Sequence, residues 1–296
     1  MSVPIALPAA LVYGVADFTG GLASRRAPVL AVTAGVQGVG LIALLPFVFL
    51  VVGAPSGAAF GVGAAGGLAG ATGLLLYLRG LAVGPMGVVA PLSAVVGAGL
   101  PLVIGIVWGE RPGVLTLVAI AVALVAILLA TAGTAPGTGA RLGPLLGLGA
   151  GIGFGLFFVA LDATPPDSGL WPLVAGRLTT APVLTVLALL LTPRESAVPA
   201  DRVRGSGGSR IGRLGLLKPP TRGLVGVSGV FDTGANVLFL LATRTGDLGV
   251  SAVIVSLYPV VVVLLARFVL KERLTGMQIG SAGLALGASV LLAVGS

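Results

Sequence analysis

The chain carries two acidic side chains inside otherwise apolar segments, each with a polar neighbour four residues away. The stretch VYGVADFTGG contains Tyr13 and Asp17, and FDTGANVLF contains Asp232 and Asn236. Residues four apart lie on one face of a helix, so each pair can point into a shared space. A carboxylate at depth among apolar residues is costly, and these acids are therefore candidates for ligand or proton binding.

Further polar residues in apolar segments complete a predicted substrate pathway. Gln37 and Arg177 are 140 residues apart and are candidates for equivalent positions of an internal repeat. Two carboxylates and one arginine around a cavity can bind a zwitterion such as an amino acid. One carboxyl group can also couple transport to protons, if desolvation favours its neutral form. The pathway is completed by Ser93, Ser256 and Tyr258.

Each of these residues also has a structural interpretation. Arg177 can neutralise Asp232 or Asp17 as a buried ion pair, and serines inside helices often bond to their own backbone. Asp17 lies less than about two helical turns from the predicted end of its helix, near Arg25 and Arg26, which is compatible with a place at the membrane interface. The functional interpretation is better supported for Asp232, which lies well inside its segment.

The composition identifies an integral membrane protein. Of 296 residues, 56% are hydrophobic and 9% are charged, whereas about 25% are charged in a soluble domain. The mean hydropathy is +1.14. The basic residues lie between apolar runs, so membrane orientation explains them better than nucleic-acid binding. We expect a multi-pass protein of the cell membrane, monomeric or homodimeric, that contacts the lipid bilayer and binds no nucleic acid.

The residue types disfavour enzymatic chemistry. The chain has no cysteine and no histidine, which removes thiolate metal sites and the commonest general base. It also lacks a Gly-x-Ser-x-Gly elbow and a Walker-type Gly-x-x-x-x-Gly-Lys loop, so an intramembrane enzyme and an ATP-driven pump are poorly supported. We expect no catalytic residue, no metal and no cofactor.

Ten apolar segments each approach the roughly 20 residues that a helix needs to cross a bilayer. They are 4–23, 29–52, 58–79, 86–108, 113–132, 143–162, 170–191, 223–243, 248–270 and 275–295. The sequence therefore predicts an all-α membrane protein with ten transmembrane helices. Kinks are expected at Pro91, Pro101 and Pro259, because proline removes a backbone hydrogen bond. The abundant glycines are expected to allow close helix packing.

The longest connection, residues 193–222, is rich in Gly, Ser, Pro and Arg and is predicted to be a surface loop. With ten spans, fourteen Lys and Arg residues, seven of them in this loop, fall on one side of the membrane, and Arg111 and Arg244 fall on the other. The positive-inside rule then predicts a cytoplasmic loop and both termini outside. Contact of the loop with anionic lipid is the alternative explanation of its charge.

An internal repeat relates the two parts of the chain at an offset of 162 residues. The most specific match pairs Glu110 and Arg111 with Glu272 and Arg273. We predict two five-helix repeats, residues 1–134 and 142–296. Because five is odd, the repeats must be inverted relative to each other, as in carriers that work by alternating access. The four charged residues are predicted to be gate or helix-end contacts.

The final segment, VSLYPVVVVLLARFVLKERLTGMQIGSAGLALGASVLLA, resembles the end of EamA-type carriers of the drug/metabolite transporter superfamily. The matching positions are Pro259, Glu272, Arg273 and Gln278. Two positions depart from the pattern: Lys271 stands where the turn usually has glycine, and Gly280 follows Gln278 by two residues where the family has three. The first half keeps the turn whole, as Gly109, Glu110 and Arg111.

The resemblance implies a carrier, and such carriers include exporters of amino acids and related metabolites. It also implies that both termini lie inside the cell. The count of basic residues predicts the opposite orientation, and we retain that orientation as the prediction. We expect a secondary transporter that moves a small polar metabolite, such as an amino acid, outward by alternating access, with protons as an optional coupling ion. The alternatives are an uptake carrier for a sugar or similar nutrient and a non-transporting membrane scaffold.

Overall fold

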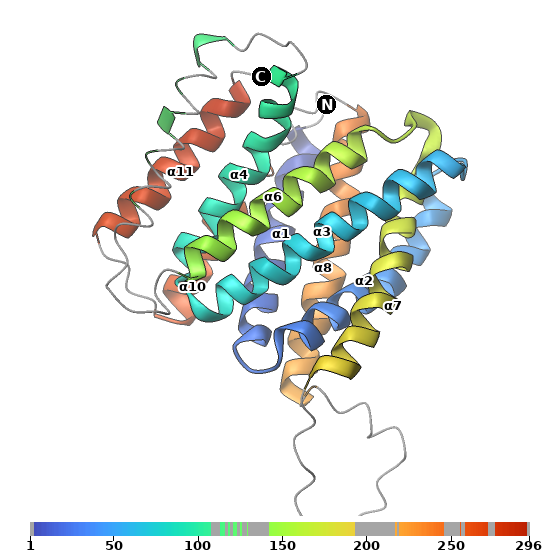
Figure 1. Ribbon diagram of the computed structural model, residues 1–296, viewed down its shortest axis with the longest axis horizontal. Coiled ribbons are helices and arrows are strands. Elements are labelled where there is room, and N and C mark those ends of the chain that lie inside the picture. The colour runs from blue at the N-terminus through green and yellow to red at the C-terminus, as the bar shows by residue number, and fades with distance from the viewer. Residues whose placement is uncertain are drawn as a thin grey trace, which may run out of the picture.

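The computed structural model describes residues 3–107, 142–192, 219–245, 258–271 and 276–294, together with positions 113–115, 118, 121, 122, 125, 129, 217 and 255. Every regular element in these ranges is a helix (Figure 1). The helices are α1 (Val3–Ser24), α2 (Val29–Leu50), α3 (Gly57–Val83), α4 (Met86–Val107), α6 (Leu142–Asp162), α7 (Trp171–Leu191), α8 (Pro219–Thr245), α10 (Tyr258–Val269) and α11 (Gly276–Val294), with a short 3-10 helix at Pro166–Ser168. The prediction of an all-α protein is confirmed for the described part of the chain.

Several helices have the length and composition of membrane spans. Five of those described are long and apolar enough to cross a bilayer: α2, α3, α6, α7 and the Pro219–Ala242 part of α8. Large apolar side chains are exposed on the outside of the bundle; Phe49 is 87% exposed, Leu190 74% and Phe268 75%. Such side chains are stable against the hydrocarbon of a bilayer and unfavourable against water. The chain is therefore a multi-pass membrane protein.

The helix bounds differ from the predicted segments at two ends by about one turn. α3 continues to Val83 instead of ending at residue 79, because the exposed Arg79 side chain does not interrupt the backbone hydrogen bonds of the helix. α8 begins at Pro219, so the last four residues of the predicted loop 193–222 belong to a helix. Prolines fit this first turn because its N–H groups have no helical acceptor. The predicted segment 113–132 and most of the loop lie largely outside the described residues.

The helices before residue 107 pack mainly against those after residue 142. α3 lies along α6 and α7, α1 lies along α8, and α2 lies along α7 and α8 (Figure 1). α4 packs against α6, α10 and α11, and α1 also contacts α10. Contacts among α1 to α4 themselves are fewer. The two parts of the chain therefore interleave in one bundle and do not form separate lobes.

Helix lengths follow the offset found in the sequence. α3 and α8 each have 27 residues, and both their first and their last residues are 162 positions apart. α4 ends at Val107 and α10 ends at Val269, again 162 positions apart. The starts of α3 and α8, at Gly57 and Pro219, thus agree with the offset.

Close helix crossings depend on glycine. A Cβ atom on Gly67 of α3 would lie 2.3 Å from the Cα atom of Gly176 on α7. On Gly153 of α6 it would lie 2.6 Å from the Cα atom of Gly73 on α3. Only residues without a side chain permit backbones to approach this closely.

Hydrogen bonds join the turns at each end of the bundle. At one end, Arg25 donates to the carbonyl oxygens of Leu81 and Gly84, at 3.0 and 3.2 Å, and ties the end of α1 to the turn between α3 and α4. At the other end, the Ala54 amide donates to the Asp167 carbonyl oxygen at 2.9 Å and joins the α2–α3 and α6–α7 turns. The chain termini lie at the end away from the close of α7 and the start of α8 (Figure 1).

Candidate functional site

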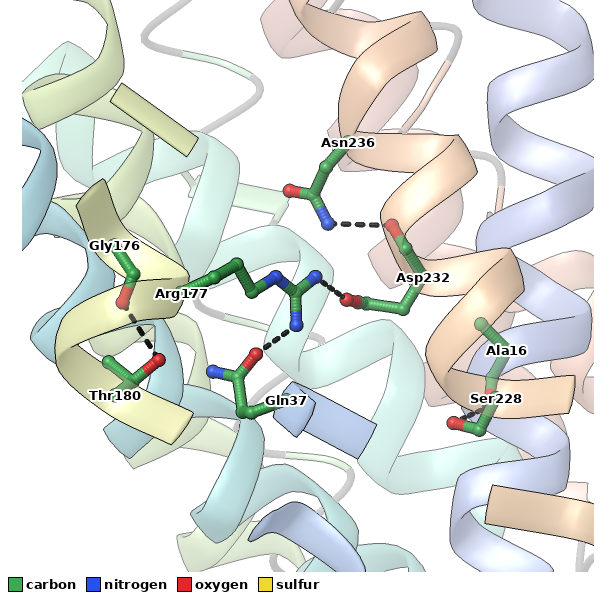
Figure 2. A network of polar contacts seen from close by, with 8 residues as sticks. All are labelled: Ala16, Gln37, Gly176, Arg177, Thr180, Ser228, Asp232 and Asn236. Atoms are coloured by element: carbon green, nitrogen blue, oxygen red, sulfur yellow. Dashed lines mark hydrogen bonds and ion pairs between the residues drawn. The ribbon is translucent and has the colours of Figure 1, made fainter. Parts of the chain in front are cut away.

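A buried arginine links the second apolar helix to two helices from the later part of the chain. Arg177 of α7 donates through Nη1 to Oε1 of Gln37 on α2, and its Nη2 forms an ion pair with Oδ2 of Asp232 on α8 (Figure 2). Gly40 lies close to the guanidinium: a Cβ atom there would be 2.8 Å from Nη1 of Arg177. We call Gln37, Arg177 and Asp232 the arginine network.

The arginine network is shielded from solvent. The side chains of Arg177 and Asp232 are 10% and 13% exposed, and Gln37 is buried. Asn236 donates through Nδ2 to the backbone oxygen of Asp232 at 2.7 Å, one turn earlier on the same helix. It therefore approaches the arginine network without bonding to its carboxylate (Figure 2). The ion pair is the structural role that the sequence analysis left open for Arg177, and it uses Asp232 and not Asp17.

A second polar group lies around Asp17 of α1. The Tyr77 hydroxyl of α3 lies beside both the Asp17 carboxyl group and the Tyr258 hydroxyl of α10. Ser93 of α4 lies beside the Tyr258 hydroxyl. The ring of Tyr13 faces that of Tyr258, with centroids 6.2 Å apart. We call Tyr13, Asp17, Tyr77, Ser93 and Tyr258 the tyrosine cluster.

The tyrosine cluster contains every tyrosine of the chain. The sequence has three tyrosines, and helices α1, α3 and α10 bring all of them to Asp17. Asp17 is 8% exposed, and Tyr77 and Ser93 are fully buried. The position of Asp17 is therefore interior, and Arg25 extends from the end of the helix to carbonyl groups of α3 and the turn after it.

The tyrosine cluster and the arginine network are neighbours. The Tyr13 hydroxyl lies close enough to feel the charges of Asp232 and Arg177 as well as that of Asp17. The carboxyl groups of Asp17 and Asp232 also repel each other. Next to Asp17, the Ala16 carbonyl oxygen accepts a hydrogen bond of 2.9 Å from Ser228 of α8 (Figure 2). This contact holds α1 against the helix that carries Asp232.

Three buried hydroxyl groups beside these residues lack hydrogen-bond partners. Tyr77 Oη, Ser93 Oγ and Thr233 Oγ1 have none of normal geometry within the described part of the chain. A Cβ atom on Gly40 would lie 2.6 Å from Thr233 Oγ1, so this hydroxyl adjoins the arginine network. Buried polar groups are nearly always satisfied, so unpaired ones at a charged centre indicate places for a ligand or water.

Sequence reasoning missed Tyr77 and Thr233. Tyr77 stands alone in the apolar run LLLYLRG, with no polar residue one turn away on its helix face, so no spacing pattern marks it. Its rarity was the available signal, because tyrosine occurs only three times in the chain. Thr233 directly follows Asp232, and threonines inside helices commonly bond to their own backbone, so its type and position did not mark it.

The structure describes only some of the residues that the sequence predicts to form kinks or gates. Pro91 and Pro101 both lie inside α4. Pro259 lies in α10, whose described part begins at Tyr258. Ser256, Glu110, Arg111, Glu272 and Arg273 lie outside the described residues.

The described ranges offer no alternative metal centre beside these residues. They contain no group of three acidic residues that could hold a metal ion. A surface pocket of about 390 Å³ lies between α2, α3 and α7 near Arg79, and its lining is mostly apolar. None of the predicted pathway residues lines that pocket.

A bundle of apolar helices that buries two carboxylates, a guanidinium and unpaired hydroxyls has the architecture of a membrane transporter. The model of the EamA-like transporter family matches residues 141–294, slightly more than half of the chain. The chain belongs to this family, as the resemblance of its final segment predicted, and it is a membrane transporter of the drug/metabolite transporter superfamily.

The fold also has counterparts among solved structures. Fifteen chains match, and one of them, described only as "Crystal structure of protein", has a TM-score of 0.53. The two chains are 19% identical, and the match covers 98% of this chain and 94% of that chain. The likeness at this identity concerns the fold alone. No curated protein matches the sequence.

Proposed function

We propose that the protein is a secondary transporter that moves a small polar metabolite, such as an amino acid, outward by alternating access. In this proposal ten helices form two inverted repeats, residues 1–134 and 142–296. The observation that supports it best is the buried arginine network, whose members come from both repeats. An ionisable centre between two repeats is where alternating-access carriers bind substrate.

The packing of the helices supports the inverted repeat. If α1, α2, α3 and α4 correspond to α6, α7, α8 and α10, the contact of α3 with α6 corresponds to the contact of α8 with α1. The contact of α3 with α7 corresponds to that of α8 with α2, and the contact of α2 with α7 corresponds to itself. All of these contacts are present. Together with the equal lengths of α3 and α8, they favour two related halves.

Proton coupling is the part of the proposal that depends on the acids. Asp17 and Asp232 repel each other in a region of low polarity, and protonation of one of them relieves that repulsion. A carrier that must bind either a proton or a substrate at such a centre can exchange the two across the membrane. Outward direction and the amino-acid class come from the family resemblance.

Flux in proteoliposomes tests the proposal. Purified protein is first screened by thermal shift against amino acids and related metabolites at two pH values, and each stabilising compound is then assayed with an imposed proton gradient. We expect gradient-driven flux that Asp232→Asn abolishes, and flux measured from each side separately distinguishes export from uptake. Flux of every compound at the rate of empty liposomes contradicts transport, and flux that ignores the gradient contradicts proton coupling.

A further inference from the structure

We propose that the tyrosine cluster is a subsite for the ammonium group of the substrate, so that the transported compounds are organic amines. In this proposal Asp17 is the counter-ion and the rings of Tyr13, Tyr77 and Tyr258 surround the cation. The inference rests on the proposed transport function and specifies the chemistry that the centre selects.

The distribution of charge favours a cation at Asp17. The guanidinium that the described residues place at the centre, Arg177, bonds to Gln37 and Asp232, and the charge recorded as acting on Asp17 is that of Asp232. The described centre thus holds two carboxyl groups and one guanidinium. When Asp17 is ionised, a ligand with a single positive charge neutralises the centre, whereas an anion would add to its negative charge in a region of low polarity.

The neighbours of Asp17 match the bonding needs of an ammonium group. A primary ammonium donates three hydrogen bonds and accepts none. Beside the Asp17 carboxylate, the buried hydroxyl oxygens of Tyr77 and Ser93 can each accept a hydrogen bond. Aromatic rings add attraction for a cation that lies near their faces, and this attraction is larger in a site shielded from water. The gathering of all three tyrosines at one acid supplies such rings.

The arginine network limits what the rest of the substrate can be. Arg177 uses two of its five N–H groups for Gln37 and Asp232, and its charge is paired with Asp232, so a substrate carboxylate that took over this charge would displace Asp232. The displaced acid would then be left buried without its partner. An amine without a carboxylate avoids this cost, and we expect it to bind at least as well as the amino acid from which it differs by that group.

Matched compounds test the subsite. The first set shares a hydroxyl end: serine carries both the ammonium and the carboxylate, ethanolamine carries the ammonium alone, and 3-hydroxypropionate carries the carboxylate alone. Leucine, 3-methylbutylamine and 4-methylpentanoate form a second, larger set, and choline replaces the ammonium protons of ethanolamine by methyl groups. Dissociation constants are measured on purified wild-type protein by calorimetry, with thermal shift as a second readout. We expect binding of at least one amine, and no binding of either carboxylate.

Variants locate the binding to Asp17. Asp17→Asn keeps the shape and removes the charge, and we expect it to weaken amine binding by about tenfold or more. Asp162→Asn, the same change at an exposed acid, is the control and should leave binding unchanged. Tyr77→Phe and Tyr77→Leu provide a test that does not depend on Asp17 variants folding. Loss of the hydroxyl should weaken ethanolamine more than choline, and loss of the ring should weaken both.

The outcomes separate this inference from the transport proposal. Equal amine affinity in the wild type and Asp17→Asn, binding of the carboxylates in place of the amines, or binding of none of the seven compounds overturns the subsite. If amino acids are nevertheless transported in those cases, the transport proposal stands. If amines bind through Asp17 but no compound crosses the proteoliposome membrane, the subsite stands and the transport proposal fails.

Discussion

Gln37 on α2 and Arg177 on α7 are joined by a hydrogen bond, and they occupy positions 140 residues apart on the second helices of the two predicted repeats. Two equivalent positions can touch each other only near the axis that relates their repeats. The arginine network would therefore lie at the axis of the proposed inverted repeat. A side chain at such a place contacts both halves and responds to their relative movement.

The ion pair between Arg177 and Asp232 should matter for stability. In Arg177→Met the Asp232 carboxylate remains buried without its cation, and we expect the free energy of unfolding to fall by about 3 kcal/mol or more. Adding Asp232→Asn removes the unpaired charge and should restore most of that loss. Thermal unfolding in detergent provides the measurement. A single variant as stable as the wild type would contradict the buried pair.

Gly67 should be intolerant of any side chain. The Cβ atom of an alanine would overlap the Cα atom of Gly176, and we expect Gly67→Ala to lower stability by about 1–3 kcal/mol. Gly61 lies on the same helix with no atom within 4 Å of the corresponding position, so Gly61→Ala is a matched control. It should leave stability unchanged or raise it by up to about 1 kcal/mol, because alanine is the better helix former. Similar effects of the two substitutions would argue against the α3–α7 crossing.

Lys271 should be improved by glycine. It has a φ of 53°, in the left-handed region, directly after α10 and Leu270. A side chain costs about 1 kcal/mol in this conformation, so we expect Lys271→Gly to raise the free energy of unfolding by that amount. Lys271→Ala removes the same charge but keeps a Cβ atom. If both variants gain equally, the effect comes from charge and not from backbone conformation.

The count of basic residues predicts which end of the bundle faces the cytoplasm. Because the chain has no cysteine, single cysteines can report exposure without a background. We expect Ser206→Cys, in the basic loop, to react with a membrane-impermeant maleimide only in inside-out vesicles. Ala54→Cys, in the exposed α2–α3 turn at the other end, should react only in right-side-out vesicles. The reverse pattern would favour the orientation that the family resemblance implies.

The helices were predictable because they depend on local sequence, whereas parts of the site depend on tertiary contacts. Long apolar runs located the described helices to within a few residues, with deviations at Arg79 and Pro219, where a charged or proline residue was taken as an end. Spacing within one helix found Asp17 and Asp232. It could not find Tyr77, whose relation to Asp17 arises only when α3 packs beside α1. The partner of Arg177 was left open for the same reason.

The glycine crossings of α3 have a mechanical consequence. Where Gly67 meets Gly176, and Gly73 meets Gly153, backbone lies directly on backbone. Helices that interdigitate must lift or rotate their side chains before they can slide, but smooth surfaces in contact can shift by small shear steps. α3 touches both α6 and α7 through such surfaces. Small shear steps along α6 and α7 are therefore the movement of α3 that these crossings favour.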